Sequence, residues 1–251
     1  MKRAAKKSDR KNKIRLGVNI DHAATLRQVR GGITSYPDLL RLCHISKKAG
    51  AEQITIHLRE DRRHIQLQDL IELSSFCPLE LNLEMAANEE MLKYALKYRP
   101  DWVCFVPEKR QELTTEGGLD VKKGKKKMGA MIERFQRIGI ESSMFIAPDL
   151  SQVKASYEVG ADAIEIHTGH WVQYSGEKKN REWKKILECA EYAHSLKLNV
   201  HAGHGLDFEH TKMITHVPHL REVNIGHSII CYSLEYGLEE TLRKFKRILN
   251  S

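Results

Sequence analysis

The sequence predicts an α/β protein of the (β/α)8 barrel class, also called a TIM barrel, and three observations support this. Short apolar runs alternate with longer amphipathic stretches, which is the pattern of repeated strand–helix units. Eight such units follow one another with short connections, and eight units allow a parallel sheet to close on itself. The length of 251 residues matches the roughly 250 typical of one such domain.

The predicted strands are short runs rich in β-branched and other apolar side chains. The stretch Ile54–Leu58 is the clearest, and it leads into a cluster of arginines, carboxylates and histidine up to His64. The eight predicted strands are residues 16–20, 54–58, 79–85, 102–106, 143–147, 163–167, 199–202 and 222–225.

The predicted helices lie between these strands and carry recognisable end signals. Gly50 is suited to a helix C-terminus, and Asn88 to an N-cap. A long polar loop, 107–125, separates the fourth strand from its helix. The predicted helices are residues 37–48, 66–76, 89–98, 126–138, 149–160, 181–196, 209–216 and 238–249.

The positive charge is concentrated in residues 1–15, which hold eight basic side chains and one aspartate. They account for +7 of the net +8, so the remaining chain is almost neutral. We expect residues 1–15 to be a disordered basic tail, and 16–251 to be one catalytic barrel domain. An arm that binds RNA or another anion is the alternative for the tail.

Composition indicates a soluble protein of a reducing compartment. Hydrophobic residues make up 41% and charged residues 29%, and no apolar run approaches the 18 or so residues of a membrane span. The five cysteines are scattered and form no C-x-x-C motif. We therefore expect a cytoplasmic protein that does not associate with membranes.

Polar residues follow the predicted strands at the ends that would converge in a barrel. Active sites of this fold lie at that C-terminal face, although the fold alone names no reaction. The candidate residues there are Asn19, Asp21, His22, His57, Arg59, His64, Glu84, Thr114, Glu165, His167, His204, Gly226 and His227.

Two features indicate phosphate binding. The glycines of Gly203–Gly205 and Gly226 follow the last two strands, where backbone N–H groups can approach an anion closely. Arg30 and the cluster from Arg59 to His64 supply cations, and guanidinium groups match phosphate oxygens. Two separated anion sites suit two phosphorylated substrates, or the two ends of one substrate.

The acid–base groups are three histidines, His57, His204 and His227, and two glutamates, Glu84 and Glu165. Such a set suits a sequence of proton transfers. A strand histidine can also be a satisfied core residue, and Glu165 can serve only to pair with an arginine. Glu84 interrupts an apolar strand, where an unused carboxylate is costly.

The sequence alone leaves three alternatives to compare. A zinc site is not expected, because the H-x-x-H pair at 201 and 204 is accompanied by no H-E-x-x-H motif. Another phosphate-handling barrel, an aldolase or an isomerase, is the main alternative, but a Schiff-base aldolase would need a strand lysine. A non-catalytic protein that binds nucleic acid through the tail is the third.

Several blocks of sequence resemble one known family, pyridoxine 5′-phosphate synthase, in the order that the family has them. The resemblance covers about residues 16–250. The blocks are LGVNIDHAATLR (16–27), ITIHLREDRRHI (54–65), LNLEMA (81–86), VPEKRQELTTEGGLDV (106–121), IEIHTG (164–169), AGHGL (202–206) and NIGHSII (224–230).

This resemblance implies a reaction and an assembly. Family members join 3-amino-2-oxopropyl phosphate to 1-deoxy-D-xylulose 5-phosphate, and release pyridoxine 5′-phosphate, phosphate and water. The resemblance implies no metal, no cofactor and a barrel that assembles into a homo-octamer. Nucleic acid is not an expected partner.

The resemblance also implies a role for individual residues, and the loop after the fourth strand would act as a lid. His57 and Glu84 would accept protons, His204 would donate one, and Glu165 would stabilise a transition state. The residues implied for the deoxyxylulose phosphate are Asp21, His22, Arg59, His64 and Thr114. Those implied for the amino ketone phosphate are Asn19, Arg30, Gly205, Gly226 and His227.

Overall fold

The computed structural model describes residues 13–114 and 117–251. Of the predicted basic tail, residues 1–12 lie outside the described residues. Within residues 13–15, Arg15 already belongs to the first strand, β1 (Arg15–Asn19), and its side chain pairs with Glu80 and Glu222. The regular structure therefore starts one residue before the boundary expected from the sequence.

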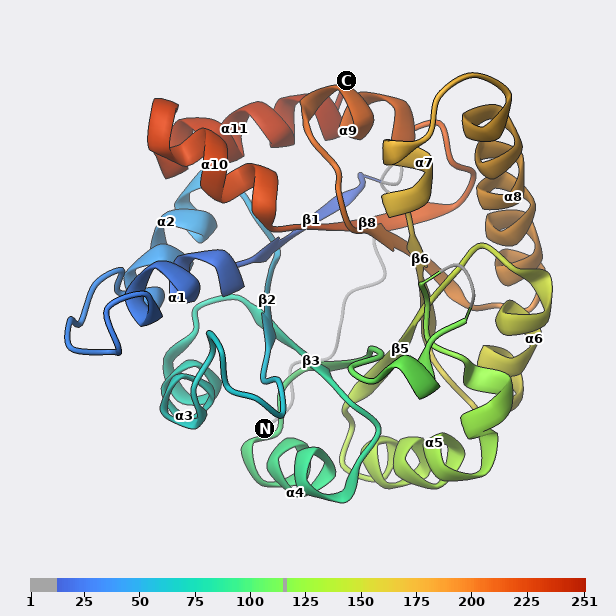
Figure 1. The fold of residues 1–251 in the computed structure, drawn as a ribbon, viewed down its shortest axis with the longest axis horizontal. Coiled ribbons are helices and arrows are strands. Elements are labelled where there is room, and N and C mark those ends of the chain that lie inside the picture. Colours follow the sequence, from blue (N-terminus) through green and yellow to red (C-terminus); the bar gives the residue numbers. More distant parts are fainter. Residues whose placement is uncertain (1–12, 115–116) are drawn as a thin grey trace.

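Eight parallel strands form a closed barrel in sequence order, as predicted (Figure 1). The first and last strands pair in parallel, with Leu16 opposite Val223, and this pairing closes the sheet. The other strands are β2 (Gln53–His57), β3 (Glu80–Met85), β4 (Trp102–Phe105), β5 (Glu141–Ile146), β6 (Ala163–His167), β7 (Asn199–Gly203) and β8 (Leu220–Ile225).

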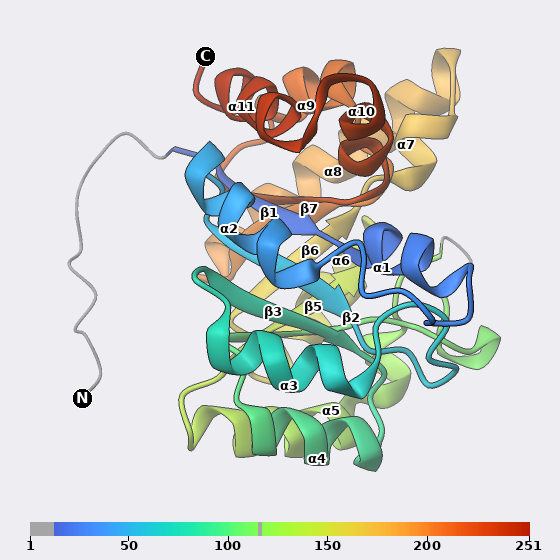
Figure 2. The same ribbon diagram turned by 90° about the vertical axis from the view of Figure 1, so that its left-hand side faces the viewer.

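Helices surround the barrel, and short extra helices lie near one end of it (Figures 1 and 2). The outer helices are α2 (Leu39–Ala49), α3 (Leu67–Phe76), α4 (Glu89–Tyr98), α5 (Val121–Gln136), α6 (Leu150–Glu158), α8 (Gly176–Ser195), α9 (Phe208–Ile214) and α11 (Leu238–Leu249). The extra helices are α1 (Asp21–Gln28), α7 (Gly169–Gln173) and α10 (His227–Tyr236), and a 3-10 turn, η1, spans Arg110–Glu112.

The extra helices and two helix starts differ from the prediction. Residues that follow β1, β6 and β8 lie outside the predicted helices, but they form α1, α7 and α10. Helix α5 starts at Val121 rather than 126, because the Asp120 side chain caps it by accepting a hydrogen bond from Lys123 N–H. Helix α8 starts at Gly176 rather than 181. The lysines at 122–127 thus lie on a helix and not in a loop.

Apolar side chains fill the layer between strands and helices, whereas the inside of the barrel is partly polar. Ile54, Ile56 and Phe105 are fully buried in the hydrophobic core. Inside the barrel, Thr55 Oγ1 donates a hydrogen bond to the side-chain oxygen of Asn224 over 3.1 Å. This polar interior reaches up to the strand ends that carry the candidate site.

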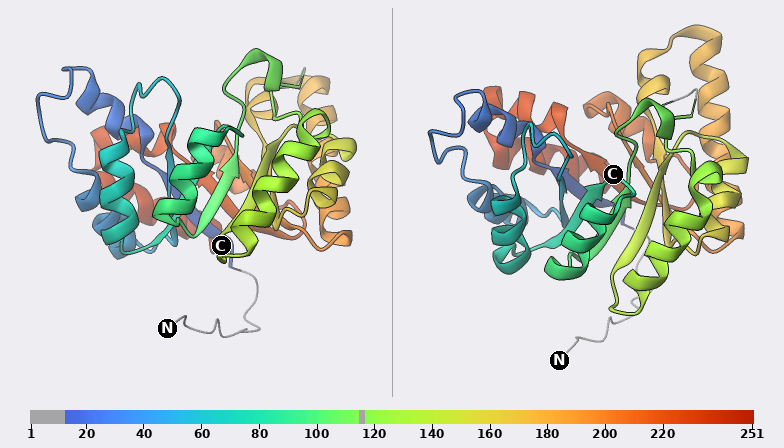
Figure 3. Two further views of the ribbon diagram at one scale, coloured as in Figure 1. Left: turned by 90° about the horizontal axis from the view of Figure 1, so that it is seen from below. Right: turned by 60° about the horizontal axis from the view of Figure 1, so that its bottom comes forward.

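The loops that follow the strands gather at one end of the molecule (Figure 3). The segments after β1, β2 and β4 rise there together, on the side opposite the end of α11. In the part of the chain that the structure describes, no helix has both the length and the apolar character needed to cross a membrane.

Candidate active site

His57, Glu84 and Asp21 form one corner of the candidate site. His57 ends β2 and lies opposite Glu84 on β3 in the parallel ladder. Its Nδ1 atom is 3.8 Å from Glu84 Oε2. Asp21, the first residue of α1, accepts a hydrogen bond from the backbone N–H of His57 over 2.9 Å, and another from the Asn19 side chain. The start of α1 therefore positions the carboxylate of Asp21 against the end of β2.

The carboxyl groups of this corner keep their protons at higher pH than usual. Burial raises the pKa of Glu84 well above its ordinary value, and the nearby charges of Asp21 and Glu165 raise it further. Burial also raises the pKa of Asp21 to about 6, against the opposing effect of the hydrogen bond from His57 N–H. Carboxyl groups of raised pKa are stronger bases than ordinary ones, which suits general acid–base catalysis.

Glu165 lies on β6 inside the barrel and is 3% exposed. Burial raises its pKa to about 8, although the Asn224 side chain opposes the shift by donating a hydrogen bond to Oε2 over 2.8 Å. Gly203 on β7 leaves the space this requires, because a Cβ atom there would lie 2.2 Å from Glu165 Oε1. The sequence around β7 thus makes room for a protonated carboxyl group.

The raised pKa of Glu165 predicts that Glu165→Gln alters how stability depends on pH. Below about pH 4.5 the carboxyl group is protonated in both the folded and the unfolded chain. Between that value and about 8, only the unfolded chain ionises, so the wild type loses stability as pH rises. Urea unfolding at several pH values should show the variant gaining relative stability across this range. Parallel profiles for the two proteins would contradict the raised pKa.

His204 follows β7 with a backbone φ of +81°, a conformation that residues other than glycine rarely adopt. The hydroxyl of Thr168 shares its one hydrogen between the carbonyls of Gly203 and His204, at 2.7 and 2.6 Å, and so holds this turn. The ring of His204 lies 4.9 Å from that of His167. Loss of contact with water lowers the pKa of His204, which makes its protonated form a stronger acid.

A second group of residues joins the start of α1 to the start of α10. The rings of His22 and His227 meet edge to face, with centroids 5.0 Å apart. Gly226 lies against Asn19, because a Cβ atom at Gly226 would be 3.0 Å from that side chain. Burial, with His227 and His204 nearby, lowers the pKa of His22. The N-terminal end of α10 therefore meets imidazole and amide groups, in an arrangement suited to an anion.

The loop after β2 supplies Arg59 and His64. Arg59 pairs with Asp61 over 3.2 Å. His64 accepts a hydrogen bond at Nδ1 from Ile65 N–H and lies 4.0 Å from Asp21 Oδ1. Burial and the neighbouring charges of His57 and Arg59 lower the pKa of His64 to about 4, so its ring is neutral at pH 7.

Three of the predicted binding residues lie less centrally. Arg30 is exposed beyond the end of α1. Thr114 lies in the segment after β4, where its N–H bonds to Gly118 O, and it lines a cavity of about 370 Å³ beside α6 and α8. Gly205, with φ of +81°, lies against Val172 of α7. The structure thus gathers most predicted residues but leaves Arg30 and Thr114 at the edge.

Two residues of the site were not singled out by the sequence. Glu108 contacts His57 Nε2 from the segment after β4, at 2.9 Å, and Asn224 binds Glu165. Both stand within the sequence blocks quoted above, but Glu108 lies among polar residues and Asn224 carries no charge, so neither was marked as a site residue. Only the folded arrangement reveals their partners.

The site geometry also bears on the metal and aldolase alternatives. Asp21, His57 and Glu84 each offer one ligand atom, and these atoms lie within 4.8 Å of one another, a spacing that would admit a divalent cation. The eight described strands contain no lysine, as the sequence indicated, so none of them supplies a Schiff-base amine.

The fold and this cluster of histidines and carboxylates define a (β/α)8-barrel enzyme with its site at the C-terminal ends of the strands. The model of one family, "Pyridoxal phosphate biosynthesis protein PdxJ", matches residues 16–251. The chain belongs to this family and is an enzyme of pyridoxal phosphate biosynthesis.

Curated relatives match the sequence of this protein over nearly its whole length. Pyridoxine 5′-phosphate synthase of Bdellovibrio bacteriovorus is 69% identical over 239 residues, covering 95% of this chain and 99% of the relative. The protein of the same name from a Wolbachia species is 46% identical over 240 residues, and the match covers 95% of this chain and 100% of the relative. The family resemblance predicted from the sequence is therefore confirmed.

Solved structures of low sequence identity share the fold. 3-Hexulose-6-phosphate synthase of Salmonella typhimurium is 12% identical, with a TM-score of 0.66 and coverage of 94% of this chain and 99% of that one. At this identity the likeness shows the barrel alone.

Proposed function

We propose that this enzyme condenses 3-amino-2-oxopropyl phosphate with 1-deoxy-D-xylulose 5-phosphate. The products are pyridoxine 5′-phosphate, inorganic phosphate and two molecules of water. The observation that carries the proposal is the corner of His57, Glu84 and Asp21, where carboxyl groups of raised pKa adjoin an imidazole. Ring formation by condensation and dehydration requires this kind of repeated proton transfer.

Four residues carry the proposed chemistry. His57 and Glu84 accept protons from the joined substrates, and His204 donates a proton to a departing oxygen. The low pKa of His204 makes its protonated form a stronger acid, and the raised pKa of Glu84 makes its ionised form a stronger base. Glu165, protonated up to about pH 8, stabilises negative charge that develops on the substrate.

The binding residues divide between the two substrates. We assign the deoxyxylulose phosphate to the side that contains the loop after β2, where Arg59 supplies a guanidinium group. We assign the amino ketone phosphate to the start of α10. The first set is Asp21, His22, Arg59, His64 and Thr114. The second set is Asn19, Arg30, Gly205, Gly226 and His227.

The segment after β4 completes the proposed site, and three wider properties are proposed with it. Closure of this segment over the substrates would exclude water from reactive imines. Binding of two phosphate esters, a homo-octameric assembly and a cytoplasmic location follow from the resemblance of the sequence blocks. Light scattering on the purified protein tests the assembly.

The reaction test supplies both substrates with a chelator present and follows pyridoxine 5′-phosphate by absorbance. Product should form at the same rate with and without the chelator, because the proposed acid–base groups are side chains. Omitting either substrate is the control. No product from the complete mixture would refute the proposed function. Activity that needs an added divalent cation would instead assign a metal to Asp21, His57 and Glu84.

A further inference from the structure

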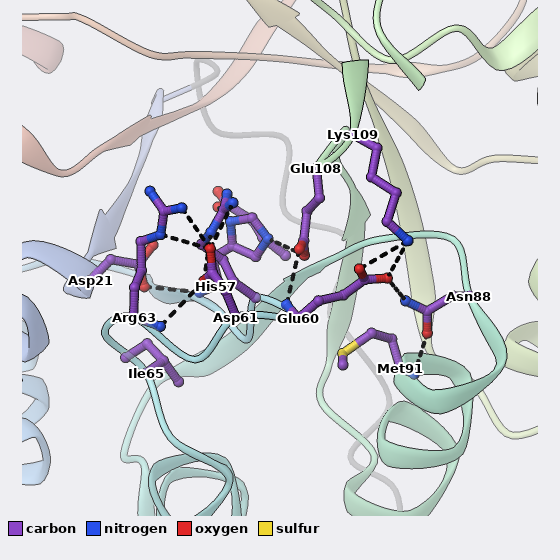
Figure 4. Close-up of polar contacts among 12 residues, drawn as sticks. Asp21, His57, Glu60, Asp61, Arg63, Ile65, Asn88, Met91, Glu108 and Lys109 are labelled. Carbon is purple, nitrogen blue, oxygen red and sulfur yellow. Dashed lines mark hydrogen bonds and ion pairs between the residues drawn. The ribbon is translucent and has the colours of Figure 1, made fainter. Parts of the chain in front are cut away.

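Glu108 is a buried carboxylate in an otherwise exposed segment. Its side chain is 4% exposed, whereas that of its neighbour Lys109 is 59% exposed. Both of its oxygen atoms are engaged: Oε1 lies 2.9 Å from His57 Nε2, and Oε2 accepts a hydrogen bond from Glu60 N–H over 2.9 Å (Figure 4). Glu108 therefore links the segment after β4 to the loop after β2.

The backbone around Glu108 is fixed by contacts that need no substrate. Glu112 Oε2 accepts hydrogen bonds from the N–H groups of Glu108 and Lys109, at 2.9 and 3.0 Å. Lys109 Nζ lies 3.0 Å from Glu60 Oε2, and Glu60 also accepts a hydrogen bond from the Asn88 side chain (Figure 4). The carboxylate is thus held against His57 by preformed structure.

The partners of Glu108 determine which nitrogen of His57 carries the proton. Burial opposes ionisation of Glu108, but the hydrogen bonds from His57 and from Glu60 N–H outweigh it, and its pKa is lowered. An ionised carboxylate only accepts hydrogen bonds, so the proton must be on Nε2 of His57. The other ring nitrogen, Nδ1, then carries a lone pair and faces Glu84 Oε2 at 3.8 Å.

We propose that Glu108 is the positioning residue for His57, holding Nε2–H so that Nδ1 is the atom that accepts the substrate proton. The inference rests on the proposed function, in which His57 is a proton acceptor. When Nδ1 takes up a proton, the imidazolium lies between the carboxylate of Glu108 and the carboxyl group of Glu84. An ionised carboxylate behind an imidazole both fixes the tautomer and stabilises the positive charge that forms.

The variant Glu108→Gln tests this role. An amide has one oxygen and one NH2 group, so it cannot accept hydrogen bonds from both His57 Nε2–H and Glu60 N–H. We expect kcat to fall about 10–100-fold, as for other orienting carboxylates, with KM for both substrates within about twofold of wild type. Glu108→Asp keeps two acceptor oxygens and should recover part of the loss.

A neutron structure of the free protein provides the readout that a merely structural role would not affect. It should show hydrogen on Nε2 of His57 in the wild type, and a changed ring orientation or protonation in Glu108→Gln. Because this measurement needs no turnover, it tests Glu108 separately from the reaction. If wild type made no pyridoxine phosphate but carried the Nε2 proton, the proposed function would fail and the orienting contact would stand.

Glu133→Gln is the matched control. Its side chain is 65% exposed on α5 and pairs with Arg137, so it contacts neither Glu108 nor the residues that hold Glu108 in place. We expect its kcat to stay within about twofold of wild type. Three results would overturn the proposal: hydrogen on Nδ1 in the wild type, near-normal kcat in Glu108→Gln, or an equal loss of kcat in Glu133→Gln.

Discussion

Replacing His204 by alanine is expected to lower kcat about 10²–10⁴-fold, the range associated with loss of a general acid or base. The imidazole follows β7 and lies beside His167 at the C-terminal end of the barrel. Its lowered pKa suits proton donation to a departing oxygen. Because Thr168 holds the turn through backbone carbonyls and not through the imidazole, removal of the imidazole should leave the fold intact. Steady-state kinetics and circular dichroism measure the two effects.

Two further variants separate the loss of the imidazole from an effect on the backbone at His204. Its φ of +81° disfavours alanine, so a loss of kcat could reflect a shifted turn. His204→Asn tolerates positive φ better and still lacks an imidazole, so it should lose as much activity as alanine. His219 also has positive φ, at 59°, and is exposed outside the site; His219→Ala should retain kcat. Activity of His204→Asn close to wild type would end the assignment of His204 as proton donor.

The barrel could be predicted because its signals are local. Each strand is an apolar run of a few residues, and the predicted strand at 54–58 differs by one residue from β2. The short helices α1 and α7 could not be predicted in the same way, since five to eight residues give too few turns to establish a helical period. The start of α5 was missed because the Asp120 cap stands in a polar stretch that resembles a loop.

The candidate site divides along similar lines. Glu84 could be predicted because a carboxylate inside an apolar strand is costly unless it is used or paired. Glu108 stands among polar residues, so nothing in the local sequence indicates that it is buried. Its burial arises from contacts with His57, at the end of β2, and with Glu60 in the loop that follows β2. Asn224 is a neutral residue whose role depends on Glu165, 59 positions away in the chain.

Replacing Glu84 by glutamine is expected to lower kcat about 10²–10⁴-fold, with KM much less affected. Glutamine keeps the shape of the side chain but can neither take up nor release a proton. Burial and the nearby Asp21 and Glu165 raise the pKa of Glu84, so the wild-type carboxylate is a stronger base than an ordinary one. Steady-state kinetics over a range of pH measures the loss, which should persist at every pH at which the wild type is active.

Glu80→Gln is the control for this variant, because it makes the same change on the same strand. Glu80 lies at the opposite end of β3 and pairs with Arg15, away from His57. If chemistry is confined to the C-terminal strand ends, Glu80→Gln should alter stability and leave kcat unchanged. Undiminished kcat in Glu84→Gln would exclude a role for Glu84 as base. Equal losses in both variants would instead mean that β3 tolerates neither change. The loss of kcat in Glu84→Gln would then not be evidence for a catalytic role of Glu84.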